Sequence, residues 1–371
     1  MTKRILLLYI SEHSGHHCAS LAIEKALKAL DPSAETLNIN CFNYTNPILE
    51  KVINRAYMSV IKARPEIWDY LYDNPDVLKR TQKFREMIHR FNTGKLNTLI
   101  SEFKPDAVVC TQAFPCGMIA DYKKSFGLTM PLVGVLTDYA PHSYWIYNNV
   151  DCYIVPSPEA GKKLVENGID PEKIKVYGIP VDSKFNQRID AESVCKRLDL
   201  DSGVPRILIM GGTQGLGPIK EVVRLLDRSH LKVQNIIVTG TNKRLFKWLS
   251  RWKFRNKTLV LPYAPNIDEL MGLASFIITK PGGITTAEAL AKGLPMLIVS
   301  PLPGQEAMNT RFLLHEGVAV KAENPQDVVV LLEELLYNKN KLRLMSNMAL
   351  SLSKPDSAVN IAKLVLGLAG R

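Results

Sequence analysis

The sequence predicts an α/β protein built from two doubly wound, Rossmann-like domains, and three observations lead to this expectation. The chain has 371 residues, which is longer than one compact α/β core usually runs and suits two domains. Short apolar runs alternate with segments of helical spacing, as in a parallel sheet covered by helices on both faces. The alternation forms two separate series, so the second half of the chain repeats the architecture of the first.

The first series opens with the apolar run Arg4–Ile10, which we expect to be a strand, then a turn at Gly15 and a helix over 18–30. The same pattern predicts three more strands in this half, at 106–110, 131–136 and 151–155. The second series predicts four strands, at 206–210, 235–238, 275–279 and 296–299. A parallel sheet in each half follows from these runs.

The two series are separated by a turn-forming stretch, Gly178–Asp182, and a polar segment over 183–202. We therefore predict an N-terminal domain over 1–180, a C-terminal domain over 181–355, and a C-terminal helix over 356–371 that packs back on the N-terminal domain. Ligands of such sheets bind at the carboxyl ends of the strands. The loops that follow the strands should face a cleft between the domains and carry the chemistry.

The net charge of +11 and the pI near 9.2 point to an anionic partner: a phosphate-bearing substrate, nucleic acid or an acidic membrane surface. No apolar run approaches the roughly 18 residues that span a bilayer, so any membrane contact should be peripheral. Six scattered cysteines without a zinc-like Cys-x-x-Cys pair are expected to be reduced thiols in the cytoplasm.

A glycine-rich loop, Gly211–Pro218, follows the strand ending at Met210 and opens a helix. Such a loop lets a pyrophosphate approach backbone N–H groups at a helix N-terminus, with Gly212, Thr213 and Gln214 as the candidate contacts. The alternative is a tight strand-to-helix turn without a ligand.

Two later strands end in similar loops. The first reads Thr279-Lys-Pro-Gly-Gly-Ile-Thr-Thr-Ala-Glu288, and its candidate donor-binding residues are Lys280, Gly282, Gly283, Thr285 and Glu288. Glu288 suits the two hydroxyls of a ribose, although a carboxylate near a helix start also serves the helix dipole. The second loop, Pro301–Asn309, offers polar groups for sugar hydroxyls, or for capping a helix, from Gln305, Glu306 and Asn309.

With these motifs in view, the segment Thr279–Asn309 resembles the donor site of the monogalactosyldiacylglycerol synthase and processive diacylglycerol glucosyltransferase family. The stretches Thr137–Trp145 and Val176–Pro180 resemble segments of the same family in the same order, so the likeness covers nearly the whole chain. The resemblance implies a GT-B fold, a UDP-hexose donor held by the C-terminal domain, and inverting transfer to diacylglycerol that makes a glycosyldiacylglycerol. It also implies an N-terminal domain that contacts the acceptor and an anionic membrane at the inner face of the cell membrane.

The resemblance implies neither a cofactor nor a bound metal, and no nucleic-acid partner is expected. The Asp199-Leu-Asp201 run matches an Asp-x-Asp metal signature, but it precedes Ser202-Gly203 and is interpreted as a turn. Two alternatives stay open: a UDP-N-acetylglucosamine transferase acting on another lipid-linked acceptor, and a basic membrane or nucleic-acid binding protein without catalysis. The choice of glucose or galactose is not encoded in any residue that we can name.

The loop Ser11-Glu-His-Ser-Gly-His-His-Cys18 resembles the family stretch that ends in a general-base histidine. His16 and His17 are both candidates, and His16 is preferred because it directly follows the glycine. A base is needed because an alcohol has a very high pKa and attacks the anomeric carbon more easily as its proton is removed. A helix N-terminus also disfavours imidazolium, which keeps the base neutral.

Asp138, His142 and Trp145 fall where the family contacts its lipid acceptor or an anionic lipid activator, and Trp145 is equally suited to the domain core. Two segments mix aromatic and basic residues. Residues 44–90 suit an interfacial surface or an amphipathic helix over a core, and Lys243–Lys257 suits membrane or nucleic-acid contact or a crossover helix of the second domain.

Overall fold

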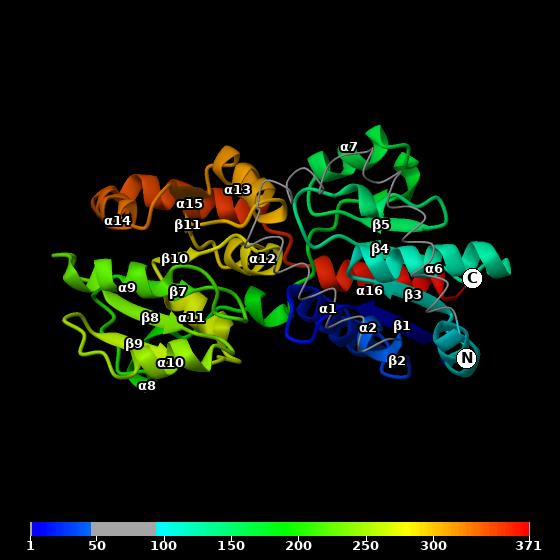
Figure 1. Cartoon of the computed structure of the whole chain (residues 1–371), viewed down its shortest axis with the longest axis horizontal. Coiled ribbons are helices and arrows are strands. Elements are labelled where there is room, and N and C mark those ends of the chain that lie inside the picture. The colour runs from blue at the N-terminus through cyan, green and yellow to red at the C-terminus, as the bar shows by residue number, and fades with distance from the viewer. Residues whose placement is uncertain (1, 46–93, 371) are drawn as a thin grey trace. The chain divides into compact units, whose positions relative to one another are not determined.

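The computed structural model describes residues 2–45 and 94–370, which form two compact α/β units (Figure 1). The first unit comprises the described residues of Met1–Ser183 together with Pro303–Gln305 and Lys354–Arg371. The second comprises Lys184–Leu302 and Glu306–Ser353. Most of residues 44–90, for which an interfacial surface was predicted, lie outside the described residues.

The first unit holds a six-stranded sheet in the order β2-β1-β3-β4-β5-β6, with every described pairing parallel. Its strands are β1 (Arg4–Tyr9), β2 (Glu35–Asn40), β3 (Ala107–Cys110), β4 (Leu132–Val135), β5 (Cys152–Ile154) and β6 (Ile174–Lys175). The helices include α1 (Gly15–Leu30), α2 (Cys41–Thr45), α6 (Ala113–Phe126), α7 (Pro158–Glu166) and α16 (Ser357–Leu368), with short 3-10 turns η1 (Ser143–Trp145) and η2 (Pro171–Lys173). Residues 94–103 are also helical.

Both faces of this sheet are buried, which explains the continuous apolar runs of its central strands. Leu6, Leu8 and Val108 face a core that includes residues of α6, whereas Ile5 and Leu7 face a core that includes residues of α1 and α16. Side chains of a strand alternate between its faces, so one apolar run supplies two cores.

The chain returns to the first unit through its last helix, α16, which packs against α1. At the start of α16 the Ser357 hydroxyl, 1% exposed, donates a hydrogen bond to the Gly178 oxygen at 2.8 Å. Gly178 has φ of +90°, and a Cβ there would lie 2.4 Å from the Lys354 Cβ. Only glycine suits this crossing of two segments.

The second unit has the same architecture, with strand order β12-β11-β10-β7-β8-β9 and parallel pairings (Figure 1). Its strands are β7 (Arg206–Met210), β8 (Gln234–Val238), β9 (Thr258–Leu261), β10 (Phe276–Thr279), β11 (Met296–Val299) and β12 (Ala319–Ala322). Its helices are α8 (Ala191–Arg197), α9 (Ile219–Arg228), α10 (Lys243–Leu249), α11 (Ile267–Leu273), α12 (Gly283–Ala291), α13 (Gln305–His315), α14 (Asp327–Tyr337) and α15 (Lys339–Leu352), and η3 (Ser183–Asn186) leads into it.

The predicted fold class is confirmed, because each unit is a parallel sheet with helices on both faces, as in two Rossmann-like domains. The eight predicted strands are the eight inner strands of the two sheets. The four strands that the sequence analysis missed are the edge strands: β2, β6, β9 and β12. In the part of the chain that the structure describes, no helix is both long and apolar enough to cross a bilayer.

Candidate functional site

The predicted site residues of the first unit follow its strands β1 and β4, in loops and in the first turns of the helices after them. After β1, residues Ser11 and His13 take positive φ values of +64° and +58°, which folds the chain into a tight loop before α1. Ser14 caps α1: its hydroxyl accepts a hydrogen bond from the His17 N–H at 3.2 Å and donates one to the Ile10 oxygen at 2.9 Å. This cap holds both histidines in the first turn of the helix.

The hydrogen bonds of His16 define its tautomer. Its Nδ1 lies 2.9 Å from the main-chain oxygen of Thr111 and 2.9 Å from the hydroxyl oxygen of Thr137. A carbonyl oxygen only accepts hydrogen bonds, so in the neutral ring the proton sits on Nδ1. The lone pair is therefore on Nε2, the nitrogen that a general base needs. The Thr111 hydroxyl donates to the His16 oxygen at 2.9 Å and ties this turn to the end of β3 a second time.

His17 is held differently. Its Nδ1 accepts a hydrogen bond from the His13 N–H at 3.3 Å, so the lone pair of that nitrogen is already used. Its ring stacks on Tyr9 with 4.2 Å between centroids and an interplanar angle of 13°. His17 thus braces the loop, and its remaining nitrogen, Nε2, carries the proton in the neutral ring.

Burial favours the neutral form of the His16 ring near pH 7. Burial lowers the pKa of His16, against an opposing effect of the Asp138 carboxylate and the hydrogen bond to Thr111. The pKa of His17 is lowered as well, first by burial and then by the nearby His13. For His142, burial reinforced by His16 and Lys163 lowers the pKa to about 3. None of these three imidazoles is a cation at neutral pH.

The loop after β4 brings Thr137 and Asp138 to His16, whereas Trp145 lies elsewhere. His142 caps η1, where its Nδ1 accepts a hydrogen bond from the Tyr144 N–H at 3.2 Å. Trp145 is 4% exposed and packs in the core of the first unit. The structure therefore favours the packing role of Trp145 over the acceptor contact that the family resemblance implied, because its indole has almost no accessible surface.

In the second unit, the glycine loop after β7 packs closely on the loop after β8. The Thr241 N–H donates to the Thr213 oxygen at 2.8 Å, and the Asn242 amide donates to the Gly215 oxygen at 3.2 Å. A Cβ on Gly215 would lie 2.1 Å from the Thr239 oxygen, and a Cβ on Gly240 would lie 2.1 Å from the Thr213 oxygen. The glycines are needed for this contact between two loops.

The sequence did not lead us to Gly240, although a glycine two residues after the β8 strand was a signal that could have identified it. Gly212 has φ of +67°, and the side chain of Gln214 is exposed. Gly212, Thr213 and Gln214 thus belong to a loop whose shape is fixed by its contacts with the β8–α10 connection.

The loop after β10 ends at the start of α12, where Gly282 is the N-cap and Gly283 the first helical residue. The first N–H groups of a helix have no partner inside the helix and point outward from its start. Thr285 and Glu288 are three positions apart, so they share a face of α12, and both side chains are half-buried. This is a surface suited to phosphate and hydroxyl groups.

Lys280 and the two residues predicted on α13 make contacts within the protein. The Lys280 ammonium pairs with the Glu306 carboxylate, whose other oxygen accepts a hydrogen bond from the Leu302 N–H at 2.9 Å. The buried Asn309 amide donates to the Pro281 oxygen at 3.0 Å. Glu306 and Asn309 thus hold the loops after β10 and β11 together, a role that neither the sugar contact nor the capping alternative described. Gln305 is the first residue of α13.

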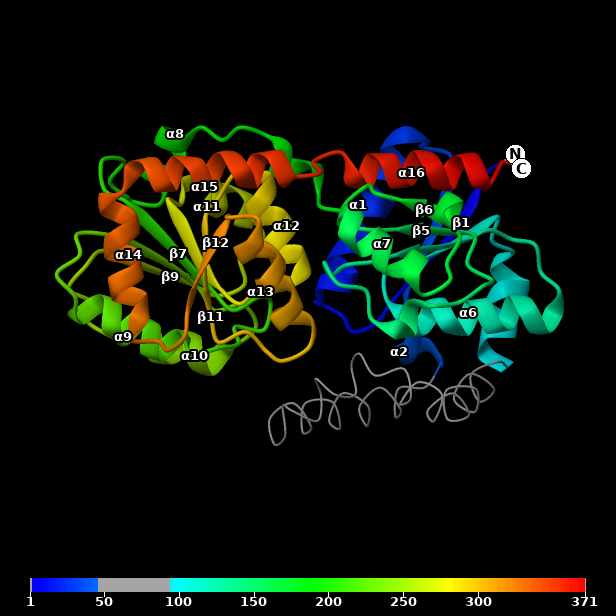
Figure 2. The same ribbon diagram turned by 90° about the horizontal axis from the view of Figure 1, so that it is seen from above.

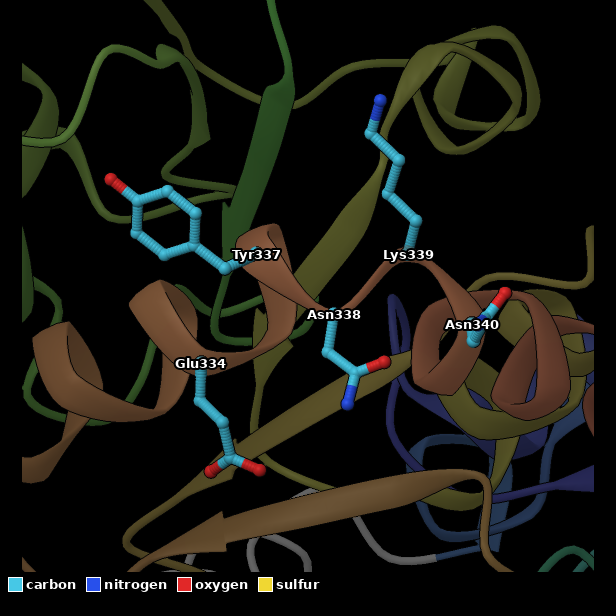
Figure 3. Close-up of a pocket in the computed structure, with 5 residues that line it drawn as sticks. All are labelled: Glu334, Tyr337, Asn338, Lys339 and Asn340. Atoms are coloured by element: carbon cyan, nitrogen blue, oxygen red, sulfur yellow. The ribbon is translucent and has the colours of Figure 1, made fainter.

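Other features lie apart from these loops. One pocket, lined by Glu334, Tyr337, Asn338, Lys339 and Asn340 where α14 gives way to α15, contains none of the predicted donor residues (Figure 3). The Asp199–Asp201 run is a turn, in which Asp199 has φ of +53° and the Asp201 carboxylate accepts from the Gly203 N–H at 2.8 Å. Among the described residues, no three His, Cys, Asp or Glu side chains gather as a metal site.

Comparison with known families divides the chain at the same place as its two sheets. The model of the family described as monogalactosyldiacylglycerol (MGDG) synthase matches residues 16–181, and the glycosyltransferase family 28 C-terminal domain matches residues 206–361. The first match includes both candidate histidines, and the second includes all the predicted donor loops.

The chain is similar to curated proteins over almost its full length. It is 30% identical over 346 residues to the processive diacylglycerol β-glucosyltransferase of Bacillus subtilis (strain 168), covering 92% of this chain and 89% of that protein. It is 30% identical over 364 residues to the protein of the same name from Bacillus pumilus (strain SAFR-032), covering 97% and 93%.

Solved structures share the fold at low sequence identity. MurG of Acinetobacter baumannii aligns with a TM-score of 0.62 at 16% identity, covering 98% of this chain and 99% of that chain. The UDP complex of S. aureus MnaA aligns with a TM-score of 0.64 at 16% identity, covering 100% and 98%. The chain therefore has the GT-B fold, with two Rossmann-like domains.

Proposed function

The chain belongs to the family of the monogalactosyldiacylglycerol synthases and processive diacylglycerol glucosyltransferases, and from this premise we propose that it moves a hexose from a UDP-hexose to diacylglycerol at a membrane surface. Among this chain's own residues, the strongest support for the proposal is the tautomer of His16. Its Nδ1 proton is held by Thr111, which leaves Nε2 as the proton acceptor.

In the proposed reaction, His16 Nε2 takes the proton of the diacylglycerol hydroxyl as its oxygen attacks the anomeric carbon. The bond from that carbon to the UDP oxygen breaks, so the anomeric centre inverts and UDP leaves as an anion. Asp138 stabilises the imidazolium that forms, since its carboxylate raises the pKa of His16. Thr111 and Thr137 keep the ring in its orientation.

The donor is proposed to bind the second unit. The glycine loop with Gly212, Thr213 and Gln214 approaches the pyrophosphate. Glu288 accepts hydrogen bonds from the ribose hydroxyls, and the Thr285 hydroxyl donates one to the ribose. Gly282 and Gly283 begin α12, whose dipole favours negative charge on the leaving UDP. Lys280, held by Glu306, adds a positive charge beside this helix start. These groups are proposed to perform the stabilisation without a bound metal.

The experiment that tests this function measures UDP release and lipid product with UDP-glucose and UDP-galactose. Dioleoylglycerol is presented in neutral detergent micelles, with UDP-N-acetylglucosamine and an undecaprenyl-linked acceptor as the comparison. Diacylglycerol-dependent release from a UDP-hexose that persists in EDTA is the expected result. Transfer only of N-acetylglucosamine, or only to the undecaprenyl acceptor, would rule the proposal out.

For localisation, we propose a peripheral protein on the cytoplasmic face of the cell membrane, because the proposed acceptor, diacylglycerol, is a membrane lipid. Co-sedimentation with membranes after mild lysis, and release by a high-salt wash, would support a peripheral association. A protein that stays in the supernatant at low salt would contradict it.

A further inference from the structure

The positive charge of this protein is concentrated in one part of the second unit. Eleven lysines and arginines stand against two acidic residues between positions 218 and 257, a net charge of +9, whereas the whole chain carries +11. All eleven basic side chains are exposed. Neither the predicted donor loops nor the candidate base uses any of them, so the concentration calls for a separate explanation.

The charge lies on two neighbouring helices, α9 and α10, on the segment after α10 and, at Lys232, in the connection from α9 to β8. The inward side of these helices belongs to the core of the second unit, with Val222, Leu226, Leu245 and Leu249 buried. Figure 2 shows α9 and α10 along the same side of the second sheet. The basic side chains therefore share a surface, which we call the α9–α10 surface; its cations are Lys220, Arg224, Arg228, Lys232, Lys243, Arg244, Lys247, Arg251, Lys253, Arg255 and Lys257.

Two tryptophans organise this surface. The rings of Trp248 and Trp252 lie 4.9 Å apart, the Lys220 Nζ lies 5.1 Å from the centroid of Trp248, and the Arg224 guanidinium carbon lies 5.0 Å from it. The same guanidinium lies 5.7 Å from the centroid of Trp252. A cation over an aromatic face is attracted by the negative charge of the ring face. The cations of α9 and α10 are thereby joined into one surface.

The acidic groups nearby do not neutralise it. Asp227 is 5% exposed and is used inside the unit, where it accepts hydrogen bonds from the Trp252 indole at 3.1 Å and the Arg255 N–H at 2.7 Å. Lys257 pairs with Asp199. Within the described part of the chain, the other six basic residues of Lys243–Lys257 make no ion pair with a carboxylate. The surface thus keeps a strong positive field.

We propose that the α9–α10 surface binds the anionic lipids of a membrane, so that the second unit has its own electrostatic contact with the bilayer. The inference rests on the proposed function insofar as a lipid acceptor brings the enzyme to a membrane. Each Lys or Arg close to an anionic bilayer adds to the attraction, so a cluster of this size is sufficient for reversible binding. The two half-buried tryptophans beside these cations suit the headgroup region of a membrane.

The state of the two indoles favours a membrane over a nucleic acid. Single-stranded nucleic acids use aromatic rings as open platforms on which bases stack. Here Lys220 and Arg224 lie over Trp248, and the Trp252 N–H is bonded to Asp227. The ring face of Trp248 is occupied by cations and is not open to a base. These cations are suited to the phosphate groups of lipids in a membrane surface.

The test compares two triple variants of the full chain, each losing two lysines and one arginine of the second unit. The surface variant is Lys243→Gln, Lys247→Gln and Arg251→Gln, and the control is Lys196→Gln, Lys339→Gln and Arg343→Gln. All six side chains are exposed. Binding is measured by sedimentation with phosphatidylcholine vesicles and with vesicles containing 30% phosphatidylglycerol, in buffer and in 1 M NaCl.

We expect the surface variant to bind anionic vesicles at least about tenfold more weakly than the wild type, and the control to stay within about twofold. The difference should vanish in 1 M NaCl, where the screening length is about 3 Å. Equal weakening of both variants, or none in the surface variant, would overturn the proposal. So would loss of binding to a 20-base-pair DNA duplex with vesicle binding unchanged, because the partner would then be a nucleic acid.

A separate measurement distinguishes this inference from the proposed function. Transfer to diacylglycerol in neutral detergent micelles needs no anionic surface, so the surface variant should keep the wild-type rate there. A wild type that binds anionic vesicles through this surface but transfers no hexose in micelles would contradict the proposed function and leave the membrane contact standing. If the wild type transfers hexose in micelles and the surface variant binds vesicles as well as the wild type does, the proposed function stands and the membrane contact of this surface is contradicted.

Discussion

The Nδ1 atom of His16 lies 2.9 Å from the main-chain oxygen of Thr111, and this single contact assigns the two ring nitrogens different roles. Nδ1 donates, so Nε2 accepts. The adjacent His17 has the opposite arrangement, since its Nδ1 accepts from the His13 N–H. Two neighbouring histidines of one helical turn are thus chemically distinct.

The first prediction separates these histidines. His16→Ala should lower kcat by about 10²- to 10⁴-fold, the usual contribution of a positioned general base. His17→Phe keeps a ring that can stack on Tyr9 and should stay within about threefold of the wild type. Steady-state rates with diacylglycerol in micelles check both variants. A larger loss in His17→Phe than in His16→Ala would show that the base has been misassigned.

The second prediction concerns pH. A base works only when neutral, so kcat/KM should rise with pH through the pKa of His16 and then level off. Because burial lowers this pKa, the midpoint of the rise should lie below the ordinary histidine value of 6.5. Asp138→Asn removes a carboxylate that raises the pKa, so the midpoint should move to still lower pH. A midpoint that moves upward in this variant would contradict the assignment.

The third prediction treats Thr137 as a positioning residue, because its hydroxyl oxygen lies 2.9 Å from His16 Nδ1. Thr137→Val keeps the shape of the buried side chain and loses the hydroxyl, and kcat should fall by about tenfold, the equivalent of one ordinary hydrogen bond. Thr137→Ser restores the hydroxyl and should recover most of the rate. KM for the donor should be unchanged in both variants; a rise in KM alone would speak against positioning.

The fourth prediction concerns the pair Lys280 and Glu306, whose side chains are 17% and 10% exposed. Glu306→Gln leaves the ammonium without its charge partner in a buried site and should cost about 3 kcal/mol of unfolding free energy. Combining it with Lys280→Met should restore part of that loss, a coupling of at least about 1 kcal/mol. Urea unfolding of the two single variants and the double variant measures it. Strictly additive effects would mean that the pair does not act as a unit.

The fifth prediction compares two glycines with nearly equal φ, Gly240 at +58° and Gly127 at +61°. An alanine in this backbone region costs about 1–2 kcal/mol at either place. At Gly240 the new Cβ would also meet the Thr213 oxygen, 2.1 Å away, whereas at Gly127 no atom lies within 4 Å. Gly240→Ala should therefore destabilise the protein by about 2 kcal/mol more than Gly127→Ala. Equal losses of Tm in the two variants would show that the loops can move apart.

The strands show how far the sequence carries the fold. The inner strands, such as Ile5–Leu8 and Arg206–Met210, are buried on both faces and are therefore continuous apolar runs that pattern analysis detects. The edge strand Glu35–Asn40 contains mostly polar residues and is only partly buried, because one side has no neighbouring strand. Its two apolar residues, Leu37 and Ile39, alternate with polar ones and form no continuous run, so the pairing with β1 defines the strand.

The candidate site was likewise predicted in part from the sequence and defined in part only by the tertiary structure. The sequence alone determined the two-domain α/β fold, the family, and the loops after the strands in which His16, Lys280 and Glu288 stand, because these depend on local runs of residues. It could not determine which histidine nitrogen carries a proton, because Thr111 is 95 positions away from His16. It also could not show that Glu306 binds Lys280 from 26 positions away. Such contacts are decided only when the parallel sheet brings the ends of its strands to one edge.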